Sequence, residues 1–330
     1  MSLVNASSLG IPSSLTFLGG SLSSLTGHIA SHPVTAPTAS FDAIYAFGDS
    51  LSDAGNVYIA TGKQSPVSPP YFQGHFTNGF TWVEDLAVSH GLGPLAPSLL
   101  SAQGSNSTDF AFGRAETGTT PLHVADDGDL PSQLMQFEEA YPTPQTNALY
   151  TLSIGSVDLF DAISVFPSAP LTALANIGIA VLNVDNFILQ LAAHDGKNFL
   201  VLTAPDIGKA PAYESEGPVA FVTASALSAV FNSALTTSLQ AIAAENHLNL
   251  SIVDTYSLVD KGVAHPELFN LTNVTDPVWT GNYTDPNSGT LRATTQAAQS
   301  QYLFWDQVHP TAAGHIILAS AAETSLLHVA

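Results

Sequence analysis

A serine, an aspartate and a histidine stand at two places in this 330-residue sequence where a hydrolytic site could form. Ser50 follows the hydrophobic run "FDAIYAF" (41–47) within "GDSLSDAGN", so it stands at the tip of an expected buried strand. Asp306 and His309 lie together in "FWDQVHPTAAGH", just before an expected helix. A carboxylate can hold the Nδ1–H of a histidine while Nε2 takes the proton of a serine hydroxyl. The pattern therefore predicts a Ser50–His309–Asp306 catalytic triad.

Each of these residues also has a simpler structural explanation. Ser50 alone would fit a helix N-cap, and His309 alone would fit a structural histidine. His315 is expected to pack or cap within the last helix, and Asp49 is expected to brace the turn that carries Ser50. Five other histidines show no ligand spacing, so the sequence predicts no metal site; they are His75, His90, His194, His247 and His265.

Apolar runs alternate with helix-like segments along the chain, and this order predicts how the candidate residues are positioned. Strands are expected at 41–47, 148–156, 197–205 and 248–257, and helices at 81–91, 170–196, 219–247 and 310–329. Such alternation predicts an α/β fold with a parallel sheet and helices on both faces. Ligands bind beyond the carboxyl ends of the strands in such folds, which is where Ser50 and "IGSVD" (154–158) stand.

Two stretches, 60–80 and 257–305, match no regular element and are expected to be long surface loops that shape a substrate groove. Several aromatic residues lie in or beside the first of them. They could line a lipid or sugar groove, or they could pack the loop onto the domain, and the second interpretation is favoured. These residues are Tyr71, Phe72, Phe76, Phe80 and Trp82.

Composition limits the kinds of partner. The formal net charge of −21 would repel phosphate backbones and anionic lipid, so nucleic-acid binding is not expected. No run reaches the roughly 18 unbroken apolar residues of a membrane helix, and no integral membrane segment is predicted. The chain contains no cysteine, which excludes disulfides, thiolate catalysis and zinc–thiolate sites. Oligomeric state is left open.

The first 40 residues differ in character from the rest of the chain. They are rich in Ser, Thr, Gly and Pro and contain no Lys or Arg, so they are predicted to be a flexible leader or linker. Residues 41–330 are predicted to form a single domain.

Five motifs, in order along residues 41–329, resemble the GDSL, or SGNH, esterase and lipase family, most of all its lecithinase/hemolysin-like branch. They are "FGDSLSDAGN", "PPYFQGHFTNGFTWVEDLA" (69–87), "DLPSQLMQF" (129–137), "NVTDP" (273–277) and "YLFWDQVHPTAAGH" (302–315). The resemblance implies a three-layer α/β/α flavodoxin-like fold and no cofactor. It also implies Ser50 as nucleophile, His309 as general base and Asp306 as its orienting acid.

The resemblance further implies an oxyanion hole, and here the sequence departs from the family pattern. The backbone N–H of Ser50 would be one donor. The family has paired glycines in the region "DFAFGRAETG" (109–118), where Gly113 matches the first and Arg114 replaces the second, and the backbone N–H of either would be another donor. The third motif, G-x-N-D, reads Gly-Ser-Val157-Asp158, so valine stands in the place of the asparagine amide. Val157 and Asp158 are expected in the substrate site. Arg114 could also act as a charged substitute donor.

The function expected from these residues is hydrolysis of a small-molecule or lipid ester through a Ser50 acyl-enzyme. Two alternatives remain open: a weakly active or inactive module that binds esters or glycans, and an acyltransferase that uses the same triad. Secretion or display at the cell surface is expected. Acyl-chain length and headgroup are not predicted.

Overall fold

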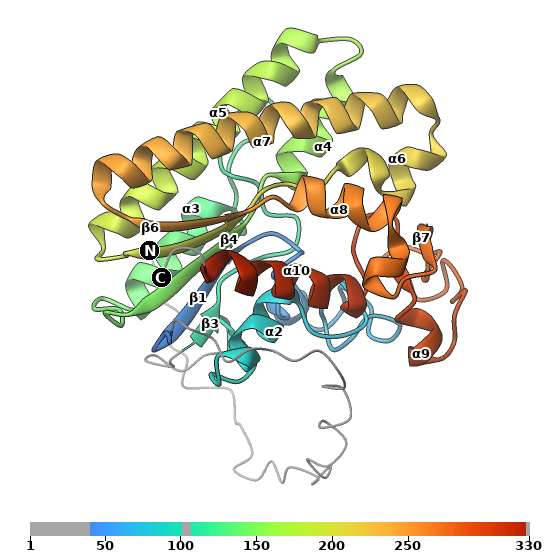
Figure 1. The fold of residues 1–330 in the computed structure, drawn as a ribbon, viewed down its shortest axis with the longest axis horizontal. Coiled ribbons are helices and arrows are strands. Elements are labelled where there is room, and N and C mark those ends of the chain that lie inside the picture. The colour runs from blue at the N-terminus through green and yellow to red at the C-terminus, as the bar shows by residue number, and fades with distance from the viewer. Residues whose placement is uncertain (1–39, 101–106, 328–330) are drawn as a thin grey trace, which may run out of the picture. The chain divides into compact units, whose positions relative to one another are not determined.

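The computed structural model describes residues 40–100 and 107–327, which belong to one compact unit (Figure 1). The leader expected over residues 1–40 lies outside the described residues, apart from Ser40.

The centre of the fold is a six-stranded sheet with the strand order β2-β3-β1-β4-β5-β6. Every neighbouring pair in it is parallel. The strands are β1 (Ala43–Gly48), β2 (Ala96–Pro97), β3 (Ser107–Asp109), β4 (Ala148–Ser153), β5 (Asn198–Leu202) and β6 (Asn249–Val253). The predicted α/β fold with a central parallel sheet is confirmed.

Helices cover both faces of this sheet because its strands are apolar on both faces (Figure 1). Along β1, the buried side chains of Tyr45 and Phe47 face one core, whereas Ile44 and Ala46 face the other. The first core is covered by α3 (Leu130–Ala140), α4 (Ser156–Val165), α5 (Pro170–Ala193) and α7 (Pro218–Asn246). The second is covered by α2 (Trp82–Ser89) and α10 (Ala312–Leu326).

The two longest helices, α5 and α7, are long and apolar enough to match a membrane span by length and composition. Their inward residues pack in the first core, for example Ile177 of α5 and Phe231 of α7. Core helices commonly meet the same criterion, and here the sheet supplies the apolar partner.

Four predicted strands and four predicted helices are present, but the region after β6 was predicted wrongly. The expected strand 248–257 ends at Val253, because the Asp254 side chain accepts the N–H of Ser257 and begins a helix, α8 (Thr255–Ala264). The expected loop 257–305 also holds α9 (Gln296–Gln299) and a two-stranded sheet. That sheet pairs β7 (Asn273–Pro277) with β8 (Tyr302–Phe304). The stretch 61–80 contains no helix or strand, as expected.

Candidate active site

The turn that carries Ser50 begins where β1 ends. Gly48 has a φ of 136°, and a Cβ placed on it would lie 2.0 Å from the backbone oxygen of Ser153 in the neighbouring strand. Only glycine fits this position. The carboxylate of Asp49 is buried and its Oδ1 accepts the N–H of Leu51 at 3.0 Å. Asp49 therefore braces the turn, as expected, and Ser50 is held at the carboxyl edge of the sheet.

The structure brings Ser50, His309 and Asp306 into one hydrogen-bonded chain. Ser50 Oγ lies 2.8 Å from His309 Nε2. His309 Nδ1 lies 2.8 Å from Asp306 Oδ2 and 3.0 Å from its Oδ1. The backbone N–H groups of Val308 and His309 also donate to Asp306 Oδ1, which fixes the carboxylate on the same short turn as the histidine. This is the arrangement in which an imidazole can take a proton from a serine hydroxyl.

A fourth residue, Tyr71, completes the chain and was not assigned this role from the sequence. Its hydroxyl donates to Asp306 Oδ2 at 2.6 Å, and the side chain is only 2% exposed. No local spacing could reveal this contact, because 235 residues separate the two partners. The only available signal was the run of aromatic residues around position 71.

These contacts determine the protonation state of Asp306. Burial acts to raise its pKa, but the facing charge and hydrogen bond of His309, the Tyr71 hydroxyl and the Val308 amide outweigh burial. The pKa of Asp306 is therefore lowered from its usual value, and the group is ionised where it holds the imidazole. Burial raises the pKa of the neighbouring Asp49 to about 7.

Another aromatic residue of the same loop, Phe76, supports the site by packing. Its ring centroid lies 5.3 Å from that of His309. A Cβ on Gly113 would lie 2.2 Å from the Phe76 ring, so this glycine lets the segment around 113 approach the ring closely. Tyr71, Phe76 and Trp82 are buried, and no aromatic residue between 71 and 82 lines the cavity described below. The packing interpretation therefore holds for Tyr71, Phe76 and Trp82, whereas Phe72 and Phe80 are partly exposed.

Two other histidines near the site have structural roles. Nδ1 of His315 accepts the backbone N–H of Trp82, and burial lowers the pKa of this imidazole to about 3, so it is neutral. His75 is buried and lies 2.9 Å from Glu84. His315 is thus a packed histidine of α10, as expected. Among residues 40–100 and 107–327, no group of three or more acidic or histidine side chains could hold a metal ion.

The backbone near Gly113 distinguishes the two candidate oxyanion donors. The N–H of Gly113 donates to the buried carboxylate of Asp53 at 2.8 Å, so it is already engaged. The next residue, Arg114, is exposed and has a φ of 71°, a conformation that favours glycine. Within the described residues, the N–H groups of Arg114 and Ser50 have no hydrogen-bond acceptor.

The two residues expected in the substrate site, Val157 and Asp158, have different surroundings at the start of α4. Val157 lines the cavity beside Ser50. Asp158 does not: it is fully buried, and its carboxylate accepts the N–H and the hydroxyl of Thr117 at 3.1 and 2.7 Å. Its placement in the substrate site was wrong. The side chains of Val157 and Asp158 leave the helix about 100° apart, and that of Asp158 is directed to Thr117.

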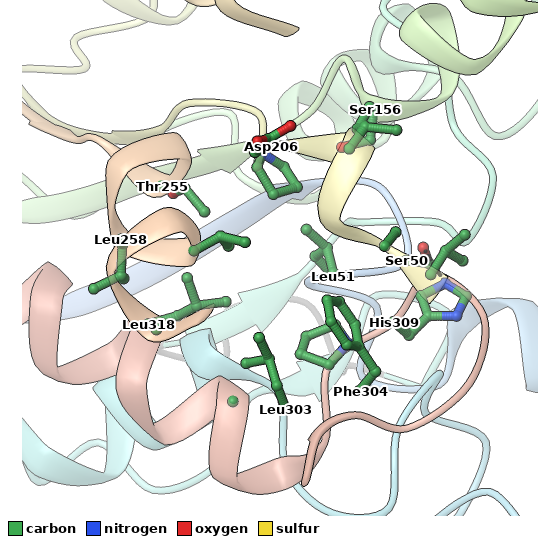
Figure 2. A pocket seen from close by; sticks show the side chains of 18 of the residues that line it. Ser50, Leu51, Ser156, Asp206, Thr255, Leu258, Leu303, Phe304, His309 and Leu318 are labelled. Carbon is green, nitrogen blue, oxygen red and sulfur yellow. Dashed lines mark hydrogen bonds between the residues drawn. The ribbon is translucent and has the colours of Figure 1, made fainter. Parts of the chain in front are cut away.

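An apolar cavity opens beside the Ser50 hydroxyl (Figure 2). It holds about 920 Å³ of space unfilled by atoms, including its mouth. The walls come from α4, α8, α10, β8 and the turn after β5. Figure 2 shows Ser50 and His309 facing one another on one side of this space, with Leu258 and Leu318 on the other side. An apolar chamber with a few polar groups at one end is typical of a small-molecule site.

Several known proteins are similar to most of this chain. It is 27% identical to the thermolabile hemolysin of Vibrio parahaemolyticus over 84% of this chain and 62% of that protein, so it spans less than two thirds of that relative. It is 25% identical to GDSL esterase/lipase 5 of Arabidopsis thaliana, over 91% of this chain and 85% of that protein. It is 24% identical to the phosphatidylcholine-sterol acyltransferase of Aeromonas hydrophila, over 86% and 90% respectively.

Among solved structures, the lipase Lip_vut3 from a goat rumen metagenome matches with a TM-score of 0.46 and 15% identity. The alignment covers 86% of this chain and 96% of that one. The sequence model of the GDSL-like lipase/acylhydrolase family matches residues 44–322, from β1 to the last helix. The chain therefore belongs to the GDSL-like lipase/acylhydrolase family, whose members are ester hydrolases.

Proposed function

We propose that this protein hydrolyses carboxylic esters through an acyl-enzyme formed on Ser50. The observation that carries the proposal is the 2.8 Å contact between Ser50 Oγ and His309 Nε2, with Asp306 on the other ring nitrogen. Family membership supports the reaction class, and the apolar cavity next to Ser50 supports an ester with an apolar part.

The geometry suggests a role for each residue in the two half-reactions. As Ser50 Oγ attacks the ester carbonyl carbon, its proton passes to His309 Nε2, and Asp306 stabilises the resulting imidazolium. Collapse of the tetrahedral adduct breaks the bond to the alcohol oxygen, which takes the proton from Nε2. In the second half, water gives a proton to Nε2 and attacks the acyl carbon. The acid then leaves, and Ser50 regains its proton.

The negative oxygen of the tetrahedral adduct needs donors, and we assign the backbone N–H groups of Ser50 and Arg114. Both lack an acceptor among the described residues, whereas the Gly113 N–H is engaged by Asp53. Val157 offers no donor from its side chain. The removal of one oxyanion donor costs about 3 kcal/mol in other serine hydrolases, so a two-donor hole would suit reactive or well-positioned esters.

Replacement of the nucleophile tests the proposal. We expect Ser50→Ala to reduce kcat for p-nitrophenyl esters by about a thousandfold or more, because no other group can form the acyl-enzyme. A serine-directed phosphonate should label wild type at Ser50 and leave Ser50→Ala unlabelled. The matched control is Ser320→Ala on an exposed turn of α10. Unchanged turnover in Ser50→Ala would reject the proposal, and an unlabelled wild type would favour a binding module.

Acyl transfer is a second candidate, supported by the similarity to an acyltransferase over most of both chains. The two reactions share the acyl-enzyme and differ in whether water or an alcohol receives the acyl group. Turnover in the presence of added alcohols or sterols separates them. Formation of the new ester at the expense of free acid would identify transfer.

A further inference from the structure

One wall of the apolar cavity beside Ser50 leaves empty space where a side chain could stand. Gly262 lies on the face of α8 that lines the cavity, and it is buried. A Cβ placed on Gly262 would meet no atom within 4 Å. A buried residue with empty space in front of it must face the void, so any side chain at this position would enter the cavity.

The opposite wall differs in this respect. Gly314 of α10 also lines the cavity, but a Cβ there would lie 2.7 Å from Pro310 and 3.1 Å from the backbone oxygen of Leu303. Gly314 is therefore needed for close packing of α10 against the preceding turn. Of these two glycines, only Gly262 leaves space that a ligand could use.

The polar groups on the cavity walls do not suit a charged ligand. No lysine or arginine is among the lining residues. The carboxylate of Asp206 is taken up by the Gly208 N–H at 3.0 Å and the Ser225 hydroxyl at 2.6 Å. Oδ1 of Asp49 accepts the Leu51 N–H, and its Oδ2 is buried without a hydrogen-bond partner among the described residues. A neutral hydrocarbon is the chemistry that matches the remaining surface.

We infer that this cavity holds the acyl chain of the ester and that Gly262 sets the room available to it. The inference rests on the proposed function, because the acyl carbon must be bonded to Ser50 Oγ. The hydrocarbon bonded to that carbon then enters the apolar space beside Ser50, which lies between α8 and α10. Each methylene buried there strengthens binding.

The test is a chain-length profile of kcat/KM with one leaving group: p-nitrophenyl acetate, butyrate, octanoate and palmitate. Wild type should prefer octanoate or palmitate over acetate. Gly262→Leu should lower the octanoate-to-acetate ratio about tenfold or more, because leucine takes the space of several methylenes. Gly262→Ala should move the ratio in the same direction by a smaller factor. This variant keeps the inference testable if the leucine variant misfolds.

The matched control is Gly178→Leu in α5, where a Cβ also meets nothing within 4 Å but the residue is exposed and does not line the cavity. Its chain-length ratio should equal that of wild type. If Gly262→Leu melts at the same temperature as wild type and its ratio is unchanged, the inference is overturned.

A second ester series fixes which half of the substrate lies in the cavity. It consists of acetate esters of ethanol, octanol and a sterol. If Gly262→Leu changes selectivity in this series and not in the acyl series, the cavity holds the alcohol and the acyl assignment is wrong.

Failure of the proposed function gives a different result, namely no turnover of any ester and no phosphonate label on Ser50. The cavity is tested in that case by titration of Ser50→Ala with methyl octanoate. Addition of Gly262→Leu should weaken this binding, and equal binding would overturn the inference.

Discussion

Among single residues, the proposed oxyanion donor at Arg114 can be tested directly. Its φ of 71° is strained for any residue with a Cβ, and its N–H is the donor we assign. Arg114→Gly keeps that N–H and relieves the strain, so kcat should fall by much less than the hundredfold or more expected for loss of a donor. Arg114→Ala, the matched variant that keeps the strain, should melt at a lower temperature than Arg114→Gly.

The opposite outcome is equally informative. If the charged side chain is the donor, both variants should lose about a hundredfold or more in kcat with little change in KM. Steady-state kinetics on one short-chain ester distinguish the two cases.

Tyr71 is the second residue whose role can be tested alone. Its hydroxyl and His309 both contact the Asp306 carboxylate, so in Tyr71→Phe the negative charge of that carboxylate interacts more strongly with the imidazole. The acid limb of the kcat/KM profile, which reports the hydrogen-bonded triad as a whole, should therefore move to higher pH. We expect kcat/KM at its plateau to fall about tenfold, equivalent to roughly 1.4 kcal/mol, as the carboxylate loses one anchor.

Tyr150→Phe is the control for this experiment, because it also deletes a buried tyrosine hydroxyl, but one in β4 that has no hydrogen-bond partner among the described residues. Its acid limb should coincide with that of wild type. A Tyr71→Phe enzyme with an unshifted limb would show that the tyrosine only fills space beside Trp305.

At the scale of elements, the sequence predicted those parts whose signal is local. Long apolar runs gave the central strands, and Pro170 marked the first turn of α5. The helices α3 and α4 were not assigned, because short segments of mixed polarity carry a weak periodic signal. The helix α8 was read as the end of a strand, although Asp254 was an available N-cap signal.

The candidate site also contains some features with a local sequence signal and others without one. Ser50, Asp306 and His309 stand in short motifs, so their association could be predicted from residue types and spacing. The Tyr71 contact, the engagement of Gly113 by Asp53 and the open wall at Gly262 depend on segments that meet only in the folded chain. The placement of Asp158 failed because the sequence does not give the rotation of α4 about its axis.

At the scale of the whole molecule, the excess of acidic groups extends into the interior. Burial raises the pKa of Asp49 to about 7 and that of Asp158 to about 6. Burial also raises the pKa of Glu116 and of Asp85. The folded protein therefore retains protons that its unfolded chain has already released at neutral pH.

This difference gives stability a definite dependence on pH. A carboxyl group whose pKa is raised by folding adds stability below its unfolded pKa and loses that contribution as the pH rises through the folded pKa. For Asp49 and Asp158 together, the free energy of unfolding should fall by about 4 kcal/mol from pH 5 to pH 8. The buried, neutral His315 offsets about 2 kcal/mol of this fall, because its imidazole takes up a proton below about pH 6.5 only in the unfolded chain. Asp306 and Glu323, whose pKa values are lowered, oppose the trend only in more acidic solution.

Thermal melts at pH 5, 6, 7 and 8 should accordingly give the highest melting temperature at pH 5. The trend should persist in high salt, because burial causes it, whereas repulsion among surface charges is screened. Asp49→Asn keeps an oxygen acceptor for the Leu51 N–H and removes the titrating group, so its melting temperature should depend less steeply on pH. A melting temperature that rises towards pH 8, or an Asp49→Asn slope equal to that of wild type, would contradict this account of the buried acids.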